Sequence, residues 1–270
     1  MKKAAVRGVA GICLAAAFAS SSFAQDPYAE SVVSYTPGTG INASYEHSST
    51  ALGAPDSAAT ITVPASGTSQ FVGVGNGGEL TLEFDTPITN DPADHAEGMD
   101  FTVFGNDFFS LGSNGISGTY DHTGLSVWVS EDNITYYELN GGLGADSAFP
   151  TNGAGDPGLP VNPSLTLSSF VGMTSAQALS LYNGSAGGSS YSLSWAVDSN
   201  GDPVDLSSIS YVRIEGTGGY GYIDSVARVE SVPEPGATGL LLAAIGAVTA
   251  RRPWRRICRG SKSPAGQAPA

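Results

Sequence analysis

Three oxygen-bearing side chains at alternate positions could bind a metal ion. Asp198, Asn200 and Asp202 have the spacing of a calcium loop, and Ca²⁺ takes six to eight oxygen ligands in proteins. An EF-hand loop also needs glycine at its sixth position and glutamate at its twelfth, where this chain has Pro203 and Ile209. The pattern therefore predicts either a calcium site of another kind or a β-turn that ends at Pro203.

A second oxygen-rich group lies between residues 85 and 107. Oxygen ligands of this type also suit Ca²⁺, so the group is a second candidate calcium site. Solvated carboxylates in turns are the alternative reading. Its members are Asp85, Asn90, Asp91, Asp94, Asp100, Asn106 and Asp107.

Catalytic signatures are scarce. His47, His95 and His122 are too dispersed for a motif such as H-E-x-x-H, and no G-x-S-x-G sequence occurs. The pair formed by Asp121 and His122 is weak by itself. Two carboxylates placed about 5 to 10 Å apart could hydrolyse glycosides, so a carbohydrate-active enzyme is the alternative to a non-enzymatic protein.

Residues 73–78 satisfy the G-x-G-x-x-G pattern of dinucleotide-binding proteins. That motif works only where a helix N-terminus follows and meets the pyrophosphate. Residues 79–84 here have the alternation of a strand, so we interpret the glycines as a hairpin.

Aromatic side chains near the ends of predicted strands could stack on sugar rings. In a sandwich, most aromatic residues belong to the core, which is the alternative for each of them. The candidates are Phe108, Phe109, Tyr120, Tyr136, Tyr137, Tyr220 and Tyr222.

Charge is segregated along the 270 residues. All 25 carboxylates lie between Asp26 and Glu234, where Arg213 and Arg228 are the only basic residues, which gives that segment 2 − 25 = −23 charges. Such a field repels nucleic acid and attracts basic groups or divalent cations. The two cysteines, Cys13 and Cys258, lie outside this segment, which excludes a disulfide or a thiol nucleophile within it.

The N-terminus has the order of a secretory signal peptide. Lys2, Lys3 and Arg7 precede an apolar run, and small residues then lead to a cleavage site between Ala24 and Gln25. Residues 1–24 are thus predicted to be removed, leaving residues 25–231 as an exported domain.

The C-terminus reads as a membrane anchor. Residues 236–250 carry no charge and are followed by a basic cluster, which is typical of a stop-transfer helix whose tail stays in the cytoplasm. Fifteen residues cover only about 22 Å of a hydrocarbon core of about 30 Å, which suits a transient anchor. The cluster includes Arg251, Arg252, Arg255 and Arg256.

Pro233, Glu234 and Pro235, followed by this short apolar segment and the arginines, resemble the PEP-CTERM sorting signal. The resemblance covers residues 232–262 and leaves residues 263–270 as a disordered tail. It implies processing by an exosortase and delivery to the cell surface or exopolysaccharide matrix of a Gram-negative bacterium.

Short runs of β-branched and aromatic residues between turn signals predict an all-β sandwich of about ten strands. Leu80, Leu82 and Phe84 alternate with polar residues, as on a strand with one buried face. Residues 175–182 predict the one helix, with Ala176, Leu179 and Tyr182 on one face. The expected strands cover residues 31–35, 59–63, 70–74, 79–84, 100–104, 125–129, 136–139, 191–197, 211–215 and 222–229.

Residues 141–165 hold four prolines and repeated glycines without any period. A loop this long in a compact domain is usually functional, so a binding surface is expected there, with a tolerated insertion as the alternative.

Five segments together resemble a family of secreted bacterial β-sandwich proteins that often carry the same sorting signal. The fold that this resemblance implies is a galactose-binding-like jelly roll, shared by carbohydrate-binding modules and adhesion domains. We therefore expect a non-enzymatic surface or matrix protein that binds glycan or has a structural role. The segments are residues 51–56, 77–85, 100–106, 182–187 and 194–204.

Overall fold

The computed structural model describes residues 26–120, 123–147 and 149–231. The predicted signal peptide with its cleavage site at Ala24 and Gln25, the predicted sorting signal and the tail lie outside these residues. Within the described ranges, no helix is long and apolar enough to cross a membrane.

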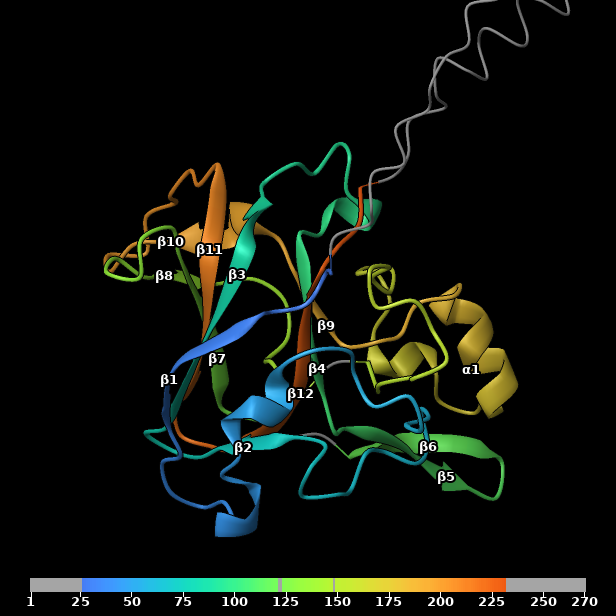
Figure 1. Cartoon of the computed structure of the whole chain (residues 1–270). Helices are drawn as coiled ribbons and strands as arrows, with labels where there is room; N and C mark the ends of the chain where they lie inside the picture. Colours follow the sequence, from blue (N-terminus) through green and yellow to red (C-terminus); the bar gives the residue numbers. More distant parts are fainter. Residues whose placement is uncertain (1–25, 121–122, 148, 232–270) are drawn as a thin grey trace, which may run out of the picture.

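The described chain is mostly β-structure and forms antiparallel sheets (Figure 1). A six-stranded sheet has the order β1 (Ser31–Thr36), β3 (Glu79–Thr89), β11 (Ser208–Gly216), β7 (Leu125–Ser130), β8 (Tyr137–Leu139), β10 (Ala196–Val197). A four-stranded sheet has the order β2 (Val72–Val74), β12 (Gly221–Arg228), β4 (Phe101–Gly105), β9 (Ser189–Tyr191). The hairpin strands β5 (Phe108–Gly112) and β6 (Gly115–Tyr120) pair with each other. The sequence-based prediction of an all-β, sandwich-like protein is confirmed.

Short helices connect the strands. The 3₁₀ helices are η1 (Ala43–Tyr45), η2 (Ser48–Ala51), η3 (Ala96–Gly98), η4 (Leu167–Ser169) and η5 (Leu193–Trp195). The α-helix α1 spans Ser175–Tyr182, as predicted. It begins with a capping box, in which Thr174 and Gln177 each satisfy the other's backbone N–H.

The main hydrophobic core lies between the two larger sheets. Leu80, Leu82 and Phe84 of β3 are fully buried and belong to the same cluster as Phe101 and Val226 of the facing sheet. Each such side chain contributes about 1.5 to 3 kcal/mol by leaving water. The alternation in β3 therefore identified its buried face correctly.

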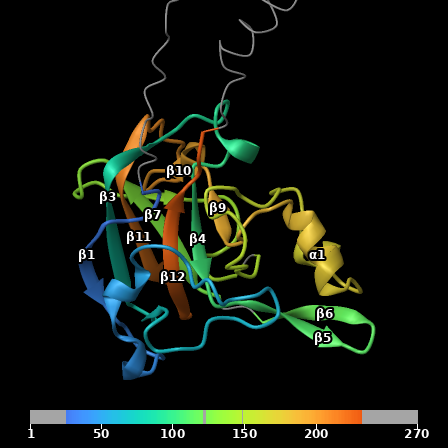
Figure 2. The same ribbon diagram turned by 45° about the vertical axis from the view of Figure 1, so that its right-hand side comes forward.

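A second core lies beside the sandwich, under α1. Figure 2 shows α1 and the β5–β6 hairpin projecting together on one side of the sheets. Ala178 and Tyr182 are buried there with Phe109 and Phe170. The helix was predicted correctly but its face was not, because residues 178 and 182, one turn apart, meet this core while Leu179 is 37% exposed.

Two predicted strands are wrong. Residues 191–197 break after β9 because the Asp100 carboxylate accepts the Leu193 N–H at 2.7 Å, which replaces a ladder bond and lets η5 form. Residues 59–63 form a tight turn, in which Thr60 and Val63 exchange backbone hydrogen bonds with each other. In both cases hydrogen bonds outside a sheet ladder override a β-like composition, and only the Thr60–Val63 pair is local, since Asp100 lies 93 positions from Leu193.

The glycines at 73–78 precede a strand and not a helix, so the dinucleotide motif is without its structural context. They do not form a hairpin, however, because β2 and β3 belong to different sheets. The glycines allow close packing instead: a Cβ on Gly75 would lie 2.3 Å from the Thr39 carbonyl oxygen. The crossing between sheets therefore explains this motif.

A buried carboxylate on β12 ties the preceding loops to the sheet. Asp224 is 3% exposed and lies at a register shift between Ile223 and Ser225. Its Oδ2 accepts the Asp56 N–H at 2.8 Å, and the Asp56 carboxylate accepts a bond from the Gln70 side chain. Burial raises the pKa of Asp224 from 3.8 to about 7. The hydrogen bond from the Asp56 N–H lowers this pKa, and the nearby Asp56 charge raises it.

Strand β12 also defines the two ends of the sandwich. Arg228 lies at its C-terminal end and contacts the first described residues. Its backbone N–H donates to the Pro27 carbonyl oxygen, and its guanidinium donates to the Asp26 carbonyl oxygen. Gly221 at its other end begins the strand about 23 Å away, from seven steps of about 3.3 Å. The described chain thus enters and leaves at one end of the sandwich.

Candidate functional site

An aromatic pocket lies at the end of the sandwich where β12 begins. Its volume is about 230 Å³. Segments far apart in the sequence converge here, from η1, the residue before β2, the end of β4, the end of β6 and the start of β12. The side chains that define this tyrosine pocket are Tyr45, Phe71, Asn106, Tyr120, Tyr220 and Tyr222.

The rings support one another. Tyr45 stacks on Phe71 with centroids 5.0 Å apart, and Tyr222 meets both rings edge-on at 5.3 and 5.0 Å. Tyr220 contacts Tyr222 at 6.1 Å in a T-shaped arrangement. Such pairs contribute about 0.5 to 1.5 kcal/mol each beyond their burial. The rings are therefore held in place before any ligand arrives.

Two tyrosines extend the pocket toward solvent. Tyr120 is 49% exposed and Tyr220 is 39% exposed, which leaves ring surface available for contact. Burial raises the pKa of Tyr222 above its ordinary value of 10, and the neighbouring Tyr220 adds to this. The Tyr222 hydroxyl stays protonated at neutral pH, so it can both donate and accept a hydrogen bond.

A buried carboxylate from the long loop fixes the base of the pocket. Asp146 is 1% exposed; its Oδ1 accepts the N–H groups of Asn106 at 2.9 Å and Asp107 at 3.3 Å, and its Oδ2 accepts that of Tyr222 at 2.9 Å. A carboxylate with several such bonds strongly orders the backbone around it. The loop of residues 141–165 thus reaches the site, and its described part contains no helix or strand.

Asn106 brings a polar group to this pocket. Its Oδ1 is buried and has no hydrogen-bond partner among the described residues. Buried acceptors without a partner are uncommon in folded proteins, and each calls for an explanation. Because this atom is sealed from solvent, a ligand hydroxyl could reach it only after the surrounding side chains move.

The structure brings together only part of the predicted aromatic set. Tyr120, Tyr220 and Tyr222 line the pocket, and Tyr45 and Phe71 were missed. Periodicity could not have identified these two, because one ends a 3₁₀ helix and the other precedes a short strand. The remaining candidates lie elsewhere: Phe108 stacks on Tyr120, Phe109 is in the second core, Tyr136 lies under the Arg213 guanidinium at 3.5 Å and Tyr137 packs on the main core.

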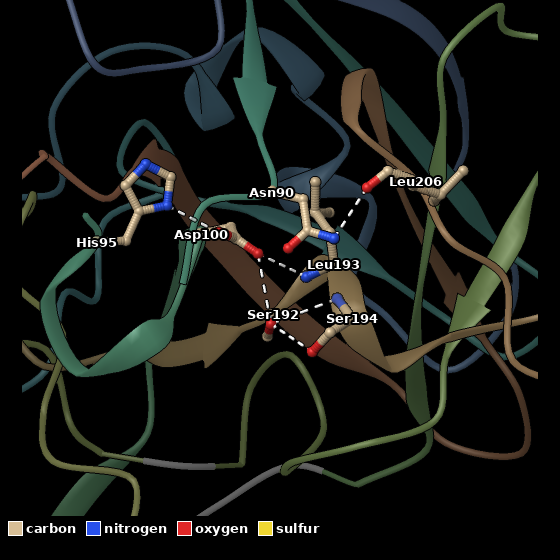
Figure 3. Close-up of polar contacts among 7 residues, drawn as sticks. All are labelled: Asn90, His95, Asp100, Ser192, Leu193, Ser194 and Leu206. Atoms are coloured by element: carbon tan, nitrogen blue, oxygen red, sulfur yellow. Dashed lines mark hydrogen bonds and ion pairs between the residues drawn. The ribbon is translucent and has the colours of Figure 1, made fainter. Parts of the chain in front are cut away.

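Asp100 is the centre of a separate buried polar network (Figure 3). Its Oδ1 lies 2.7 Å from His95 Nδ1, and its Oδ2 accepts the Leu193 N–H at 2.7 Å and the Ser192 hydroxyl at 3.4 Å. Ser192 also bonds Ser194 at 2.8 Å. Both carboxylate oxygens are therefore used to join β4, η5 and the turn at His95.

This network has the residue types of a catalytic triad without its geometry. In a triad the serine hydroxyl bonds the histidine, whereas Ser192 bonds the carboxylate. His95 and Asp100 line a cleft of about 550 Å³ at the end where the chain enters and leaves, together with Arg228 and Glu230. Two carboxylates thus share a cleft, but both oxygens of one of them are already hydrogen-bonded within the protein.

The candidate calcium ligands are placed as follows. Asp198 Oδ1 accepts the N–H groups of Asn200 at 2.8 Å and Asp202 at 2.9 Å, which closes the predicted β-turn and lowers the pKa of Asp198. Asp85 is exposed on β3, and Asp91 begins a turn that leads to η3. Among the described residues, no three acidic, histidine or cysteine side chains gather in a group that could hold a metal ion.

No protein-family model matches the chain, and no curated protein matches it either. The function therefore has to be argued from the site itself.

Proposed function

We propose that this protein is an exported, non-enzymatic glycan-binding protein of the cell surface or exopolysaccharide matrix. The observation that carries the proposal is the tyrosine pocket. Sugar rings present apolar C–H faces that stack on aromatic rings, and their hydroxyl groups bond to amide and phenol groups. The pocket presents the partly exposed rings of Tyr120 and Tyr220 beside the polar Asn106 side chain.

The charge of the domain narrows the class of glycan. Between Asp26 and Glu234 the chain carries −23 charges, and Asp146 lies directly beneath the pocket. A field of this sign disfavours uronic acids and sulfated sugars. The proposed ligand is therefore a neutral sugar or an amino sugar. It could be either the terminal unit or an internal unit of a polysaccharide.

The fold and the sequences of the two terminal segments also support a role at the cell surface or in the matrix. Successive strands pass repeatedly between the two larger sheets, as in the jelly roll that we propose for this domain. The predicted signal peptide and the PEP-CTERM-like segment support export, a transient membrane anchor through residues 236–250 and processing by an exosortase. A carbohydrate-active enzyme receives less support, because Asp100 in the two-carboxylate cleft already has hydrogen bonds to both oxygens.

A glycan array probed with the purified full chain tests the proposal. We expect binding to neutral or amino sugars, and we expect Tyr220→Ala to weaken it about tenfold, which corresponds to about 1.4 kcal/mol. Tyr136→Ala is the matched control, since this tyrosine lies outside the pocket, under Arg213. Absence of glycan binding, or equal effects of the two substitutions, would contradict the proposal.

A further inference from the structure

A second cleft lies where the two hydrophobic cores meet. Its volume is about 620 Å³, within the range of small-molecule sites. Trp195, which packs on the main core, forms one side of it. Phe149, Val161, Leu165 and Leu167 of the second core form the other side. No residue of this cleft lines the tyrosine pocket.

The polar groups of the cleft are already satisfied within the protein. Four hydroxyl groups line it, and each has a hydrogen-bond partner that does not require a ligand. The pairs are Ser189 with the Gly144 carbonyl at 2.8 Å, Ser190 with Thr102 at 2.9 Å and Thr166 with Ser168 at 2.7 Å. The surface that remains for contact is consequently apolar.

The absence of charged side chains from the described lining argues against an ionised ligand in this cleft. No acidic or basic side chain is among the described residues that line the cleft, although carboxylates are abundant elsewhere in the domain. An ionised ligand here would lose its hydration without gaining an opposite charge. A sugar would likewise find few polar groups without partners. Leu143, which is 47% exposed, adds further apolar surface at the cleft.

We infer that this cleft binds an uncharged, largely apolar small molecule, independently of the tyrosine pocket. The ligand would lie between the Trp195 ring and the aliphatic wall of Leu165 and Leu167. Affinity would come from the removal of apolar surface from water, at about 25 cal/mol for each Å². The site thus differs from the proposed glycan site in the chemistry of the ligand that it accepts.

Titration of the purified full chain with N-phenyl-1-naphthylamine, an uncharged fluorescent dye, tests this inference. We expect saturable binding of one dye molecule per chain, with energy transfer to the dye from Trp195 and from the nearby Trp128. Leu143→Asp should weaken binding about tenfold or more, because the dye would have to share the cleft with a carboxylate. Leu111→Asp is the matched control: Leu111 is also exposed, at 59%, but lies on β5 outside the cleft.

Further variants separate the inference from its alternatives. Ser168→Phe fills the cleft without adding charge and should also weaken dye binding, while melting curves verify that each variant is folded. Trp195→Phe should keep the binding and lower the energy transfer, to which Trp128 on β7 still contributes. The inference is wrong if the dye does not saturate, if Leu143→Asp and Leu111→Asp act alike, or if the dye competes with dimerisation seen by light scattering, since a second copy would then be the occupant.

Discussion

Neutralising Asp224 should change how the stability of the protein depends on pH. The unfolded pKa is 3.8 and the folded pKa is about 7, because the carboxyl group is buried on β12. Between these values the folded state holds a proton that the unfolded state has released. The stabilisation from this group is therefore complete below about pH 4 and is lost as pH rises through 7.

The size of the effect follows from the shift. A difference of about three pKa units corresponds to about 4 kcal/mol, at 1.36 kcal/mol for each unit. Domains of this kind have a total stability of about 5 to 15 kcal/mol, so the effect is large enough to measure. In Asp224→Asn the side chain stays neutral and can still accept the Asp56 N–H, so the variant should not show this loss.

Urea unfolding of the wild type and Asp224→Asn at pH 4.5, 6 and 8 measures the difference directly. Other titrating groups are common to both proteins and cancel in the difference. We expect the stability of the variant relative to wild type to rise by about 3 kcal/mol between pH 4.5 and pH 8, because the rest of the effect lies below pH 4.5. Asp85→Asn, at an exposed position on β3, is the control. A wild-type-minus-variant difference that stays constant with pH would show that folding does not raise the pKa of Asp224.

Two further substitutions and one titration test other parts of the molecule. Gly141→Ala places a Cβ 2.5 Å from the Trp195 ring and should lower the free energy of unfolding by about 1 to 3 kcal/mol. In the control Gly118→Ala the new Cβ meets nothing within 4 Å, so the free energy of unfolding should change by less than about 0.5 kcal/mol. Equal urea midpoints for the two variants would contradict this prediction. A calcium titration tests the two acidic groups: if either binds Ca²⁺ in the folded state, millimolar Ca²⁺ will raise the melting midpoint, because a ligand that binds only the folded state stabilises it. A midpoint that neither Ca²⁺ nor a chelator moves would argue against calcium at Asp198 or in the second acidic group.

Patterns that depend on neighbouring residues were predicted well from the sequence. The alternation of Leu80, Leu82 and Phe84 reflects burial on one face of a strand, which is a local property. The helix at Ser175–Tyr182 has both its capping box and its apolar residues within ten positions. The β5–β6 hairpin was missed, because the strand from Gly115 is rich in glycine and small polar residues.

The candidate site could be predicted only in part, because distant segments form it. Tyr45 and Tyr222 touch although 177 positions separate them, and no spacing rule connects them. The same limit explains the error at residues 191–197. Its β-like composition gave no sign that the Asp100 carboxylate would accept the Leu193 N–H and end the strand.

The first and last described segments meet at one end of the sandwich, which has a consequence for how many copies could act together. If copies of the protein were attached to a surface through the end of the sandwich near Arg228, their tyrosine pockets would all face away from that surface. The pockets would lie about 23 Å from the attached end. A long polysaccharide that reaches one such pocket is then at high effective concentration for the next. A layer of copies with weak individual sites would therefore hold the polymer firmly and still let each sugar exchange.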